Sequence, residues 1–276
     1  MKLLDGKALA VKLRTQLKEK IERASKIPGL AVVIVGEDQA SKIYVRNKVK
    51  ACAEVGMYSF VYELPQTTSQ EALEKLLDEL AIRKDVDGIL LQLPLPKGLN
   101  AQSAMAKIPA EKDVDGFSAE NLGKLVLHEE TFSACTPSGI MMLLQEAGVE
   151  LSGKHAVILG RSNTVGKPMA LLLLNANATV TICHSKTKNL PAICRDADIL
   201  IAAIGKAKFV TEDMIKDGAI VVDVGMNRDE NGKLCGDVDF DNIAPKASFI
   251  TPVPGGVGPM TITTLLYNTC LAAWKE

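Results

Sequence analysis

Two glycines six residues apart, Gly160 and Gly166, frame the stretch of this chain that is best suited to bind an anion. The apolar residues 157–159 lead into the first glycine, and an apolar pattern that is typical of a helix follows the second. Such a turn presents backbone N–H groups and a helix N-terminus to a phosphate group. The middle glycine of the Gly-x-Gly-x-x-Gly pattern is absent, and an ordinary strand–turn–helix joint would also need glycine to turn. The loop favours nucleotide binding, with a plain structural joint as the alternative.

The residues after the next expected strand, 179–183, bear on which dinucleotide would bind. An NAD-type site usually places Asp or Glu about 20 residues after the glycine loop, where it accepts from the ribose 2′-hydroxyl. Here Ser185 and Lys186 occupy that place, and Arg161 lies within the loop itself. Donors and cations suit a 2′-phosphate, which favours NADP. Lys186 and Lys188 could instead form a solvated charged turn.

A second group of polar residues lies in the other half of the chain. Tyr44 and Lys48 are four apart in an expected helix at 40–55, so they share one of its faces. Such a pair also arises often on solvated helices. Gln92 ends an expected strand at 88–93 and precedes Leu-Pro-Leu-Pro, whose prolines would stiffen the support of a positioned amide. A loop-capping amide is the alternative there.

Two further segments could contact a ligand. Asp113 and Asp115 flank a valine beside a glycine, but the segment lacks the further alternating oxygens of a calcium loop, so we predict no metal there. One carboxylate could bind an amino-pyrimidine-type ring, and a turn-forming Asp is the alternative. Residues 251–260 contain three glycines and three prolines. Such a rigid loop with few side chains suits the close approach of a flat ligand.

The composition of the 276 residues narrows the class of protein. Hydrophobic residues make up 47% and charged residues 24%, as in soluble globular proteins. The 32 basic and 33 acidic residues give a net charge of −1, so charge offers no reason to expect nucleic acid or an anionic membrane as a partner. No apolar run approaches the roughly 20 residues that a membrane span needs.

The N-terminus and the cysteines point to the cytoplasm. An apolar stripe near the N-terminus predicts an amphipathic helix and not a signal peptide; it consists of Leu9, Leu13, Leu17 and Ile21. The six cysteines are scattered without a Cys-x-x-Cys pair, and the three histidines show no metal-ligand spacing. We therefore expect reduced thiols, no bound metal and a cytoplasmic protein.

Alternation of short β-rich runs with helical patterns predicts an α/β fold of two domains, each with a mostly parallel sheet flanked by helices. The first domain would comprise 1–137, completed by a C-terminal helix at about 261–276, and the second, Rossmann-like domain 138–260. Within the first, Thr68-x-x-Glu71 resembles a capping box. Ligands of such sheets bind beyond the carboxyl ends of the strands, so we expect the substrate cleft between the domains.

Five motifs, in this order, resemble the bifunctional methylenetetrahydrofolate dehydrogenase/cyclohydrolase family over essentially the whole chain. They are Tyr44-Val-Arg-Asn-Lys48, Gln92-Leu-Pro-Leu-Pro96, Lys112-Asp-Val-Asp-Gly116, Gly160-Arg-Ser162 with Gly166, and Pro252-Val-Pro-Gly-Gly-Val-Gly-Pro259. The resemblance implies NADP-dependent oxidation of 5,10-methylenetetrahydrofolate and hydrolysis of the methenyl product to 10-formyltetrahydrofolate. It also implies a place in one-carbon metabolism and purine biosynthesis, and a homodimer.

The resemblance also implies roles for single residues. Lys48 would be the catalytic lysine, Gln92 the residue that orients it, Tyr44 the ring stacked beside the folate and Asp115 the carboxylate that holds the pterin. Asp113 has no such counterpart and is expected to be structural. Substrate contacts are further expected from Pro254, Gly255 and Gly256. The cofactor contacts would be Gly160, Arg161, Ser162, Gly166, Ser185 and, through its backbone at the nicotinamide end, Met226.

Three other functions share some of these features. A monofunctional dehydrogenase fits the same sequence, although it would not need both Lys48 and Gln92. A non-catalytic NADP-binding sensor would use the glycine loop but not the four polar residues of the first half. A short-chain dehydrogenase with a Tyr44/Lys48 relay is excluded by order, because its glycine loop would precede the pair.

Overall fold

The computed structural model describes residues 1–275, which form two compact units. The six-stranded unit comprises Met1–Val11 and Thr136–Thr261, and the three-stranded unit comprises Lys12–Cys135 and the chain from Ile262 onward. The chain passes between them within α1 (Gly6–Arg23), at the start of α6 (Cys135–Glu146) and within α10 (Val257–Trp274). The prediction of two α/β domains with parallel sheets is confirmed.

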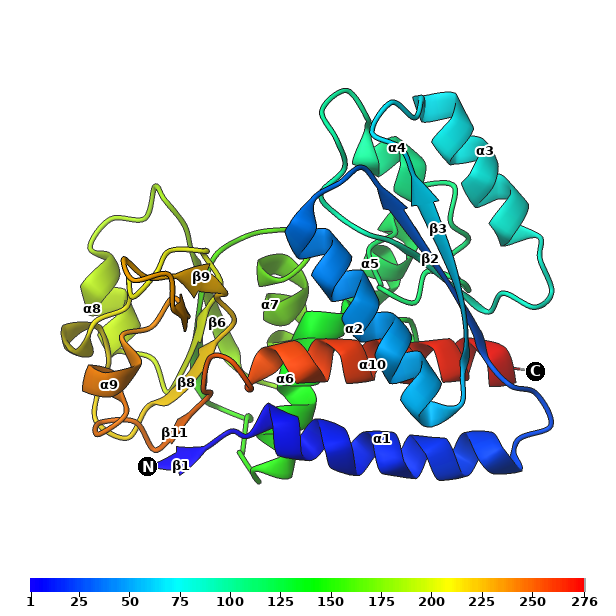
Figure 1. Ribbon diagram of the computed structural model, residues 1–276. Coiled ribbons are helices and arrows are strands. Elements are labelled where there is room, and N and C mark those ends of the chain that lie inside the picture. Colours follow the sequence, from blue (N-terminus) through cyan, green and yellow to red (C-terminus); the bar gives the residue numbers. More distant parts are fainter. Residues whose placement is uncertain (276) are drawn as a thin grey trace. The chain divides into compact units, whose positions relative to one another are not determined.

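The three-stranded unit is built on a parallel sheet in the order β3-β2-β4, which are Tyr58–Leu64, Gly29–Val35 and Gly88–Leu91. Every residue of β2 is buried, as expected for a central strand with helices on both faces. Leu30 and Val32 pack towards α1, α2 (Gln39–Val55) and α10. Ala31 and Val33 pack towards α3 (Gln70–Ala81) and α4 (Ala101–Met105) on the other face (Figure 1). A further helix, α5, spans Ala119–Val126.

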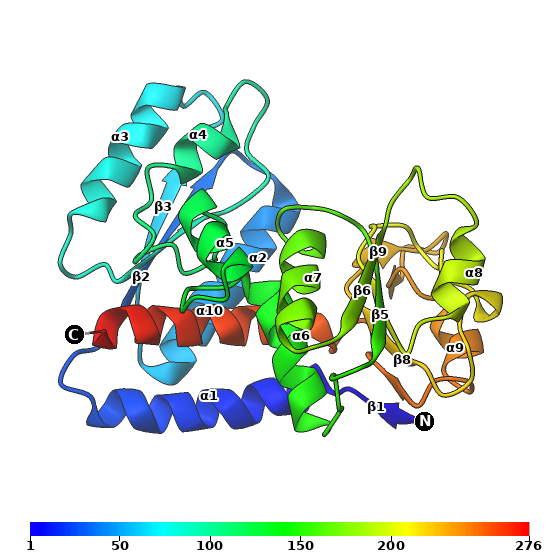
Figure 2. The same cartoon turned by 180° about the vertical axis from the view of Figure 1, so that it is seen from behind.

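The six-stranded unit contains a parallel sheet in the order β1-β11-β8-β7-β5-β6. These strands are Lys2–Leu3, Phe249–Ile250, Ile220–Asp223, Ile199–Ala202, His155–Leu159 and Thr179–Cys183. Alternate side chains of β5 enter two cores. One core lies under α6 and α7 (Gly166–Asn175), and the other under α8 (Leu190–Arg195) and α9 (Phe240–Ile243), as Figure 2 shows from behind. The short elements η1 (Glu212–Met214), β9 (Asn227–Arg228) and β10 (Leu234–Cys235) complete the unit.

The strand order places a topological switch point beside β5. Strand β5 is the first strand after α6 in the sequence, and it pairs with β6 on one side and β7 on the other. Ligands of open α/β sheets bind at such a point, beyond the carboxyl ends of the strands. Gly160 directly follows β5, and Ser185 and Met226 follow β6 and β8 by two and three residues. Three of the predicted cofactor residues therefore come from one edge of this sheet.

The N-terminus differs from the expected domain boundaries, which placed 1–137 in one domain. Residues 1–11 belong to the six-stranded unit, because β1 pairs with β11. Lys2 N donates to Ser248 O at 2.8 Å and Leu4 N donates to Ile250 O at 2.9 Å. A two-residue strand carries too little pattern to be recognised in sequence, and its partner lies almost the whole chain away.

The start of α3 also differs from expectation. Ser69, and not Thr68, is the N-cap: its hydroxyl accepts from Ala72 N at 3.2 Å. The Thr68 hydroxyl instead donates to Pro65 O at 2.7 Å. With the cap at Ser69, Glu71 is the second helical residue, one position short of where a capping box needs it.

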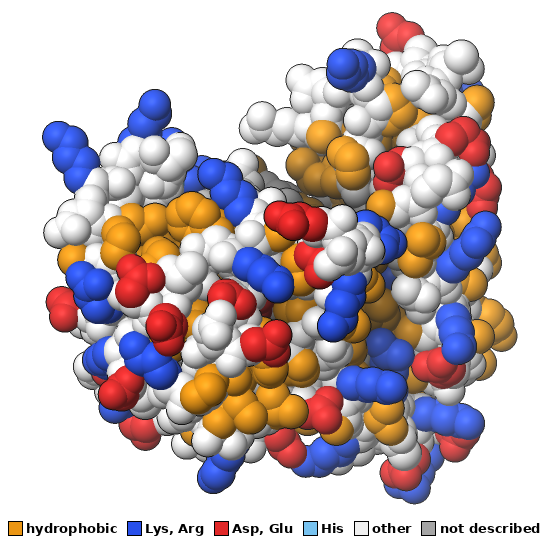
Figure 3. Space-filling model, turned by 60° about the vertical axis from the view of Figure 1, so that its left-hand side comes forward, with side chains coloured by type: hydrophobic (Ala, Val, Ile, Leu, Met, Phe, Trp, Pro, Cys, Tyr) orange, Lys and Arg blue, Asp and Glu red, His pale blue; other side chains and the backbone are white. Residues whose placement is uncertain are grey.

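The surface mixes the two signs of charge. On the face drawn in Figure 3, Lys and Arg side chains are interspersed with those of Asp and Glu. This agrees with the net charge of −1. Of the helices within residues 1–275, none is both long and apolar enough to cross a membrane.

Replacement of Ser69 by Ala tests the assignment of the cap. Ser69→Ala should lower the free energy of unfolding by about 1 kcal/mol, because the first turn of α3 loses an acceptor for its N–H groups. Thr68→Ala is the matched control and should lower the free energy of unfolding by less. Urea unfolding followed by circular dichroism measures both free energies. An equal or larger decrease in Thr68→Ala would assign the N-cap to Thr68 instead.

Candidate active site

Helix α2 presents Tyr44 and Lys48 one turn apart. The helix begins where the Asp38 carboxylate accepts from Ser41 N at 2.7 Å, and it ends at Gly56, whose φ of +82° suits glycine. Its buried face packs on the β2 side of the core, which fixes its rotation. Lys48 is partly buried, and Tyr44 is 38% exposed.

The Lys48 amine contacts Gln92 directly. Lys48 Nζ donates to Gln92 Oε1 at 2.9 Å. Gln92 follows β4, and its backbone N–H donates to Val33 O of the central strand at 2.8 Å. Its side-chain Nε2 donates to Leu93 O at 2.6 Å. Because the NH₂ group is engaged by that carbonyl, the amide oxygen is the atom turned towards Lys48.

The electrostatic surroundings of Lys48 favour its neutral form. Burial lowers the pKa of Lys48, and the Asp115 carboxylate opposes this shift only in part. Burial likewise raises the pKa of Asp115, against the opposing effect of Lys48. A neutral amide as hydrogen-bond partner adds no charge that would hold the ammonium form. An amine in this setting can accept a proton.

The backbone around Asp115 is fixed on both sides. The buried Asp113 carboxylate accepts from Phe117 N at 3.2 Å, Ser118 N at 2.7 Å and Asn121 Nδ2 at 2.9 Å. Asp113 therefore has local hydrogen-bond partners that occupy its carboxylate. On the other side Gly116 has a φ of +73°, and a Cβ there would lie 2.5 Å from Ser133 C.

The spacing of the two glycines in the loop after β5 has a steric cause. Gly160 has a φ of +120°, and a Cβ at this position would lie 2.3 Å from Ala203 O. A Cβ on Gly166 would lie 2.2 Å from Gly160 O. Each glycine thus passes against a backbone carbonyl, which a larger residue could not do. The two positions are six apart because α7 begins directly against the turn that it follows.

The polar groups of this edge can receive a dinucleotide. The Ser162 hydroxyl accepts from Val165 N at 3.1 Å and Gly166 N at 3.4 Å, so it caps the first turn of α7. Arg161, Ser162 and Ser185 are exposed, as is Met226 at 46%. The glycines leave space for close approach, and the helix N-terminus and the exposed guanidinium are positive. These features fit the phosphates of NADP.

The loop at 251–260 belongs to the six-stranded unit and is held by the start of α1. Lys7 N donates to Gly255 O at 2.8 Å, and Gly256 N donates to Pro252 O at 2.9 Å. A Cβ on Gly6 would lie 1.8 Å from Gly256 O, so this approach requires glycine. Pro254 is exposed at the turn. The structure thus brings together Lys48, Gln92 and Asp115 in one unit, and the loop residues and the cofactor residues in the other.

Comparison with known proteins decides the family. Two family models match: the catalytic domain of tetrahydrofolate dehydrogenase/cyclohydrolase over residues 4–115, and its NAD(P)-binding domain over residues 134–276. The chain belongs to the tetrahydrofolate dehydrogenase/cyclohydrolase family.

Relatives match this family member over nearly its full length. The bifunctional protein FolD of Moorella thermoacetica is 57% identical over 274 residues, which are 98% of each chain. That of Campylobacter curvus is 56% identical, over 99% of this chain and 96% of the relative.

Two solved structures are similar to it. The FolD enzyme of Campylobacter jejuni has a TM-score of 0.97 at 50% identity and covers 99% of this chain and 98% of its own. The Trypanosoma brucei enzyme, solved with NADP and an inhibitor, has a TM-score of 0.93 at 40% identity, with coverage of 98% and 96%.

Two polar residues near Asp115 in this family member were not predicted. The buried Cys135 thiol donates to Val114 O at 3.3 Å, and its pKa is raised well above the usual value by burial and by the Asp115 charge. Asn268 of α10 donates from Nδ2 to the same oxygen at 2.8 Å. No spacing motif marks either residue. The available signal was a single amide within the apolar pattern of the last helix.

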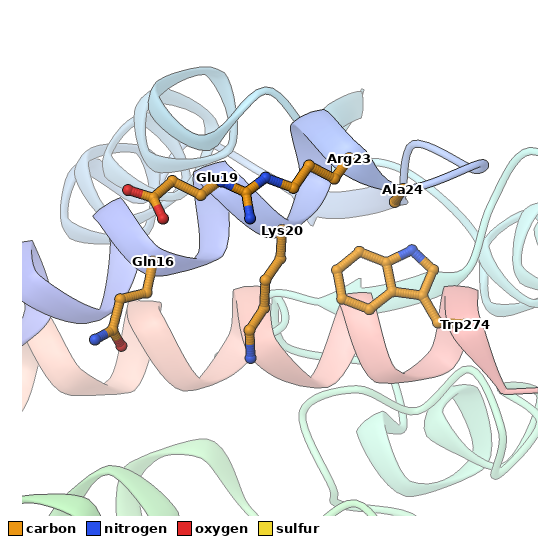
Figure 4. A pocket seen from close by; sticks show the side chains of 6 residues that line it. All are labelled: Gln16, Glu19, Lys20, Arg23, Ala24 and Trp274. Atoms are coloured by element: carbon orange, nitrogen blue, oxygen red, sulfur yellow. The ribbon is translucent and has the colours of Figure 1, made fainter.

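A hollow in the three-stranded unit lies elsewhere. It has a volume of about 630 Å³ and is open to solvent between α1 and the end of α10 (Figure 4). Its lining consists of Gln16, Glu19, Lys20, Arg23, Ala24 and Trp274. None of the predicted site residues is among them, so this hollow is not the predicted site.

The pKa of Lys48 can be tested through its partner. Gln92→Glu places a carboxylate where the amide oxygen accepts from Lys48, which should raise the pKa of the amine because the ammonium gains an opposite charge. NMR titration of lysine side chains measures this pKa. Gln102→Glu adds the same charge at an exposed position of α4 and should leave Lys48 unchanged. An unaltered Lys48 titration in Gln92→Glu would contradict the contact.

Proposed function

We propose that this protein oxidises 5,10-methylenetetrahydrofolate with NADP and hydrolyses the 5,10-methenyl product to 10-formyltetrahydrofolate, with Lys48 as the general base. The observation that carries this proposal is the hydrogen bond from Lys48 Nζ to Gln92 Oε1, made by an amine whose pKa is lowered by burial. The unit that contains it matches the catalytic-domain model of the family.

Hydrolysis uses Lys48 as a proton acceptor. The oxygen of a water molecule adds to the methenyl carbon, and the neutral amine takes the proton that this water loses. The bond from that carbon to N5 then breaks while a proton returns to N5, and the hydroxyl proton leaves to solvent. The formyl group remains on N10. A positioned general base of this kind typically contributes about 10²–10⁴ in rate.

The same neutral amine suits the oxidation. Bound NADP accepts the hydride that the methylene carbon gives up, which leaves a positive charge on the folate. A neutral Lys48 does not oppose that charge, whereas an ammonium would. Asp115 would hold the pterin ring and Tyr44 would stack beside the folate, as the family resemblance implies.

The cofactor would bind at the carboxyl edge of the six-stranded sheet. Gly160 and Gly166 allow the close approach of backbone that a pyrophosphate needs. Arg161 and Ser185 would bind the 2′-phosphate. Met226 would contact the nicotinamide end through its backbone. The loop at Pro254, Gly255 and Gly256 would contact the substrate.

We further infer a cytoplasmic homodimer. All six cysteines lie within residues 1–275 and are free, and five of them are buried, which suits a reducing compartment. The homodimer follows from the resemblance to the family.

One assay with Lys48 variants tests the proposed function. Purified protein with 5,10-methylenetetrahydrofolate and NADP should give reduced cofactor without accumulation of the methenyl compound. Lys48→Met should lower the cyclohydrolase rate by about 10²-fold or more, because the proton acceptor is lost. Lys50→Met, at an exposed position of the same helix, is the matched control.

The outcomes separate the alternatives. Accumulation of methenyl compound by the wild type would indicate a monofunctional dehydrogenase, and no change in absorbance would indicate a binding protein without catalysis. Hydrolysis at the wild-type rate in Lys48→Met would reject Lys48 as the base.

Arg161→Ala tests the 2′-phosphate assignment. Loss of a charge-assisted contact should weaken the binding of NADP by about tenfold or more. The affinity for NAD should change little, since NAD lacks the 2′-phosphate. Titration calorimetry with both cofactors gives the ratio. Lys154→Ala removes a positive charge next to the amino end of β5 and should leave that ratio unchanged. Equal losses for both cofactors in Arg161→Ala would contradict the assignment.

A further inference from the structure

Asp237 is a completely buried carboxylate at the carboxyl edge of the six-stranded sheet. Its Oδ2 accepts from Ile204 N at 2.7 Å and Gly205 N at 3.0 Å. Its Oδ1 accepts from Lys206 N at 2.8 Å and Asn227 Nδ2 at 2.9 Å. Four donors from two separate segments therefore converge on one side chain.

Asp223, at the end of β8, forms the second half of this arrangement and is 3% exposed. Its Oδ1 accepts from Gly225 N and Asp237 N, both at 2.9 Å. Its Oδ2 accepts from Val238 N at 2.9 Å. Asp223 thus holds the backbone from which Asp237 projects.

Two glycines make room for these carboxylates. A Cβ on Gly225 would lie 2.3 Å from Asp237 Oδ1, and a Cβ on Gly236 would lie 1.8 Å from Asp223 Oδ2. Each carboxylate therefore occupies the space that a side chain on the opposite strand segment would fill. The positions of both segments are set by this interlock and not by apolar packing alone.

The segments bound by Asp237 flank the predicted cofactor residues. Residues 204–206 follow β7, and the preceding Ala203 O is the atom that a Cβ on Gly160 would strike. Asn227 directly follows Met226 in the chain. Asp237 consequently connects the backbone beside the glycine loop with the backbone beside Met226.

We propose that Asp237 is a positioning residue for NADP, which fixes residues 204–206 and Asn227 so that the backbone around Met226 meets the nicotinamide end of the cofactor. This inference rests on the proposed function for the identity of the cofactor. It concerns a residue that touches neither the cofactor nor the substrate.

The chemistry of four converging donors requires a carboxylate. A carboxylate accepts through both oxygens, whereas an Asn amide offers one accepting oxygen and an NH₂ group that donates. In Asp237→Asn, two of the four donors would face another donor and remain unsatisfied, which is costly for buried groups. The segments would then shift although the side-chain volume is unchanged.

Three variants test the proposal. Asp237→Asn removes the double acceptor, and Asn227→Ala removes only the side-chain donor. Asp198→Asn is the matched control: Asp198 precedes β7 at its amino end and accepts from His155 N at 2.8 Å and Lys216 Nζ at 2.7 Å. For each, we would measure the Kd of NADP by calorimetry, the KM for NADP and kcat of the dehydrogenase, and the cyclohydrolase rate.

Asp237→Asn should raise the Kd and KM for NADP by about tenfold or more and keep the cyclohydrolase rate, because Lys48 and its partners lie in the other unit. Asn227→Ala should show a smaller rise, and it carries the test if Asp237→Asn does not fold. Asp198→Asn should leave the Kd unchanged.

Unchanged NADP affinity in Asp237→Asn would overturn the positioning role. Where a parallel loss of cyclohydrolase activity shows that Asp237→Asn has unfolded, unchanged NADP affinity in Asn227→Ala would overturn it. A wild type that binds no NADP would reject the proposed function as well. A wild type that binds NADP while Asp237→Asn behaves like Asp198→Asn would reject the positioning role alone.

Discussion

The proposed chemistry of this protein depends on one partly buried contact, the hydrogen bond from Lys48 to the amide oxygen of Gln92. Withdrawing an amine from water disfavours its charged form. A carboxylate in the place of Gln92 would restore that form, whereas an amide orients the amine without adding charge. The fold supplies the amide from the end of β4, with its backbone bound to Val33 of the central strand. Every residue of that strand is buried, so the support of Gln92 is part of the core.

Asp115 shows how narrow this electrostatic balance is. Its charge raises the pKa of Lys48, while burial lowers it and is the larger effect. Burial also raises the pKa of Asp115 itself, so the same withdrawal from water weakens the opposing charge. Moving the carboxylate closer would shift the balance towards an ion pair. The hydrogen bonds of Asp113 and the tight turn at Gly116 therefore matter, because they fix the distance of Asp115 from the amine.

Local patterns in the sequence predicted much of the fold, and long-range contacts account for what they missed. Strand β6 matches its expected range of 179–183, and α2 begins one residue before the helix expected at 40–55. The pairing of β1 with β11 was not predictable, because it joins two residues at the N-terminus to a strand near residue 250. The polar residues around Lys48 were found because they sit at strand ends or one helical turn apart. Asn268 and Asp237 were missed because their partners lie far away in sequence.

The two units differ in how they accommodate ionisable groups that are withdrawn from water. In the three-stranded unit the Lys48 amine donates to a neutral amide, and burial lowers its pKa. In the six-stranded unit the buried carboxylates organise backbone, and they are surrounded by N–H donors. Burial and the charge of the neighbouring Asp237 raise the pKa of Asp223 to about 6, and hydrogen bonds from three backbone N–H groups oppose that rise. At neutral pH this group remains an acceptor, which is what its three donors require. Several N–H donors thus favour the ionised form of a buried carboxylate, whereas the uncharged amide beside Lys48 leaves the lowering of its pKa by burial in place.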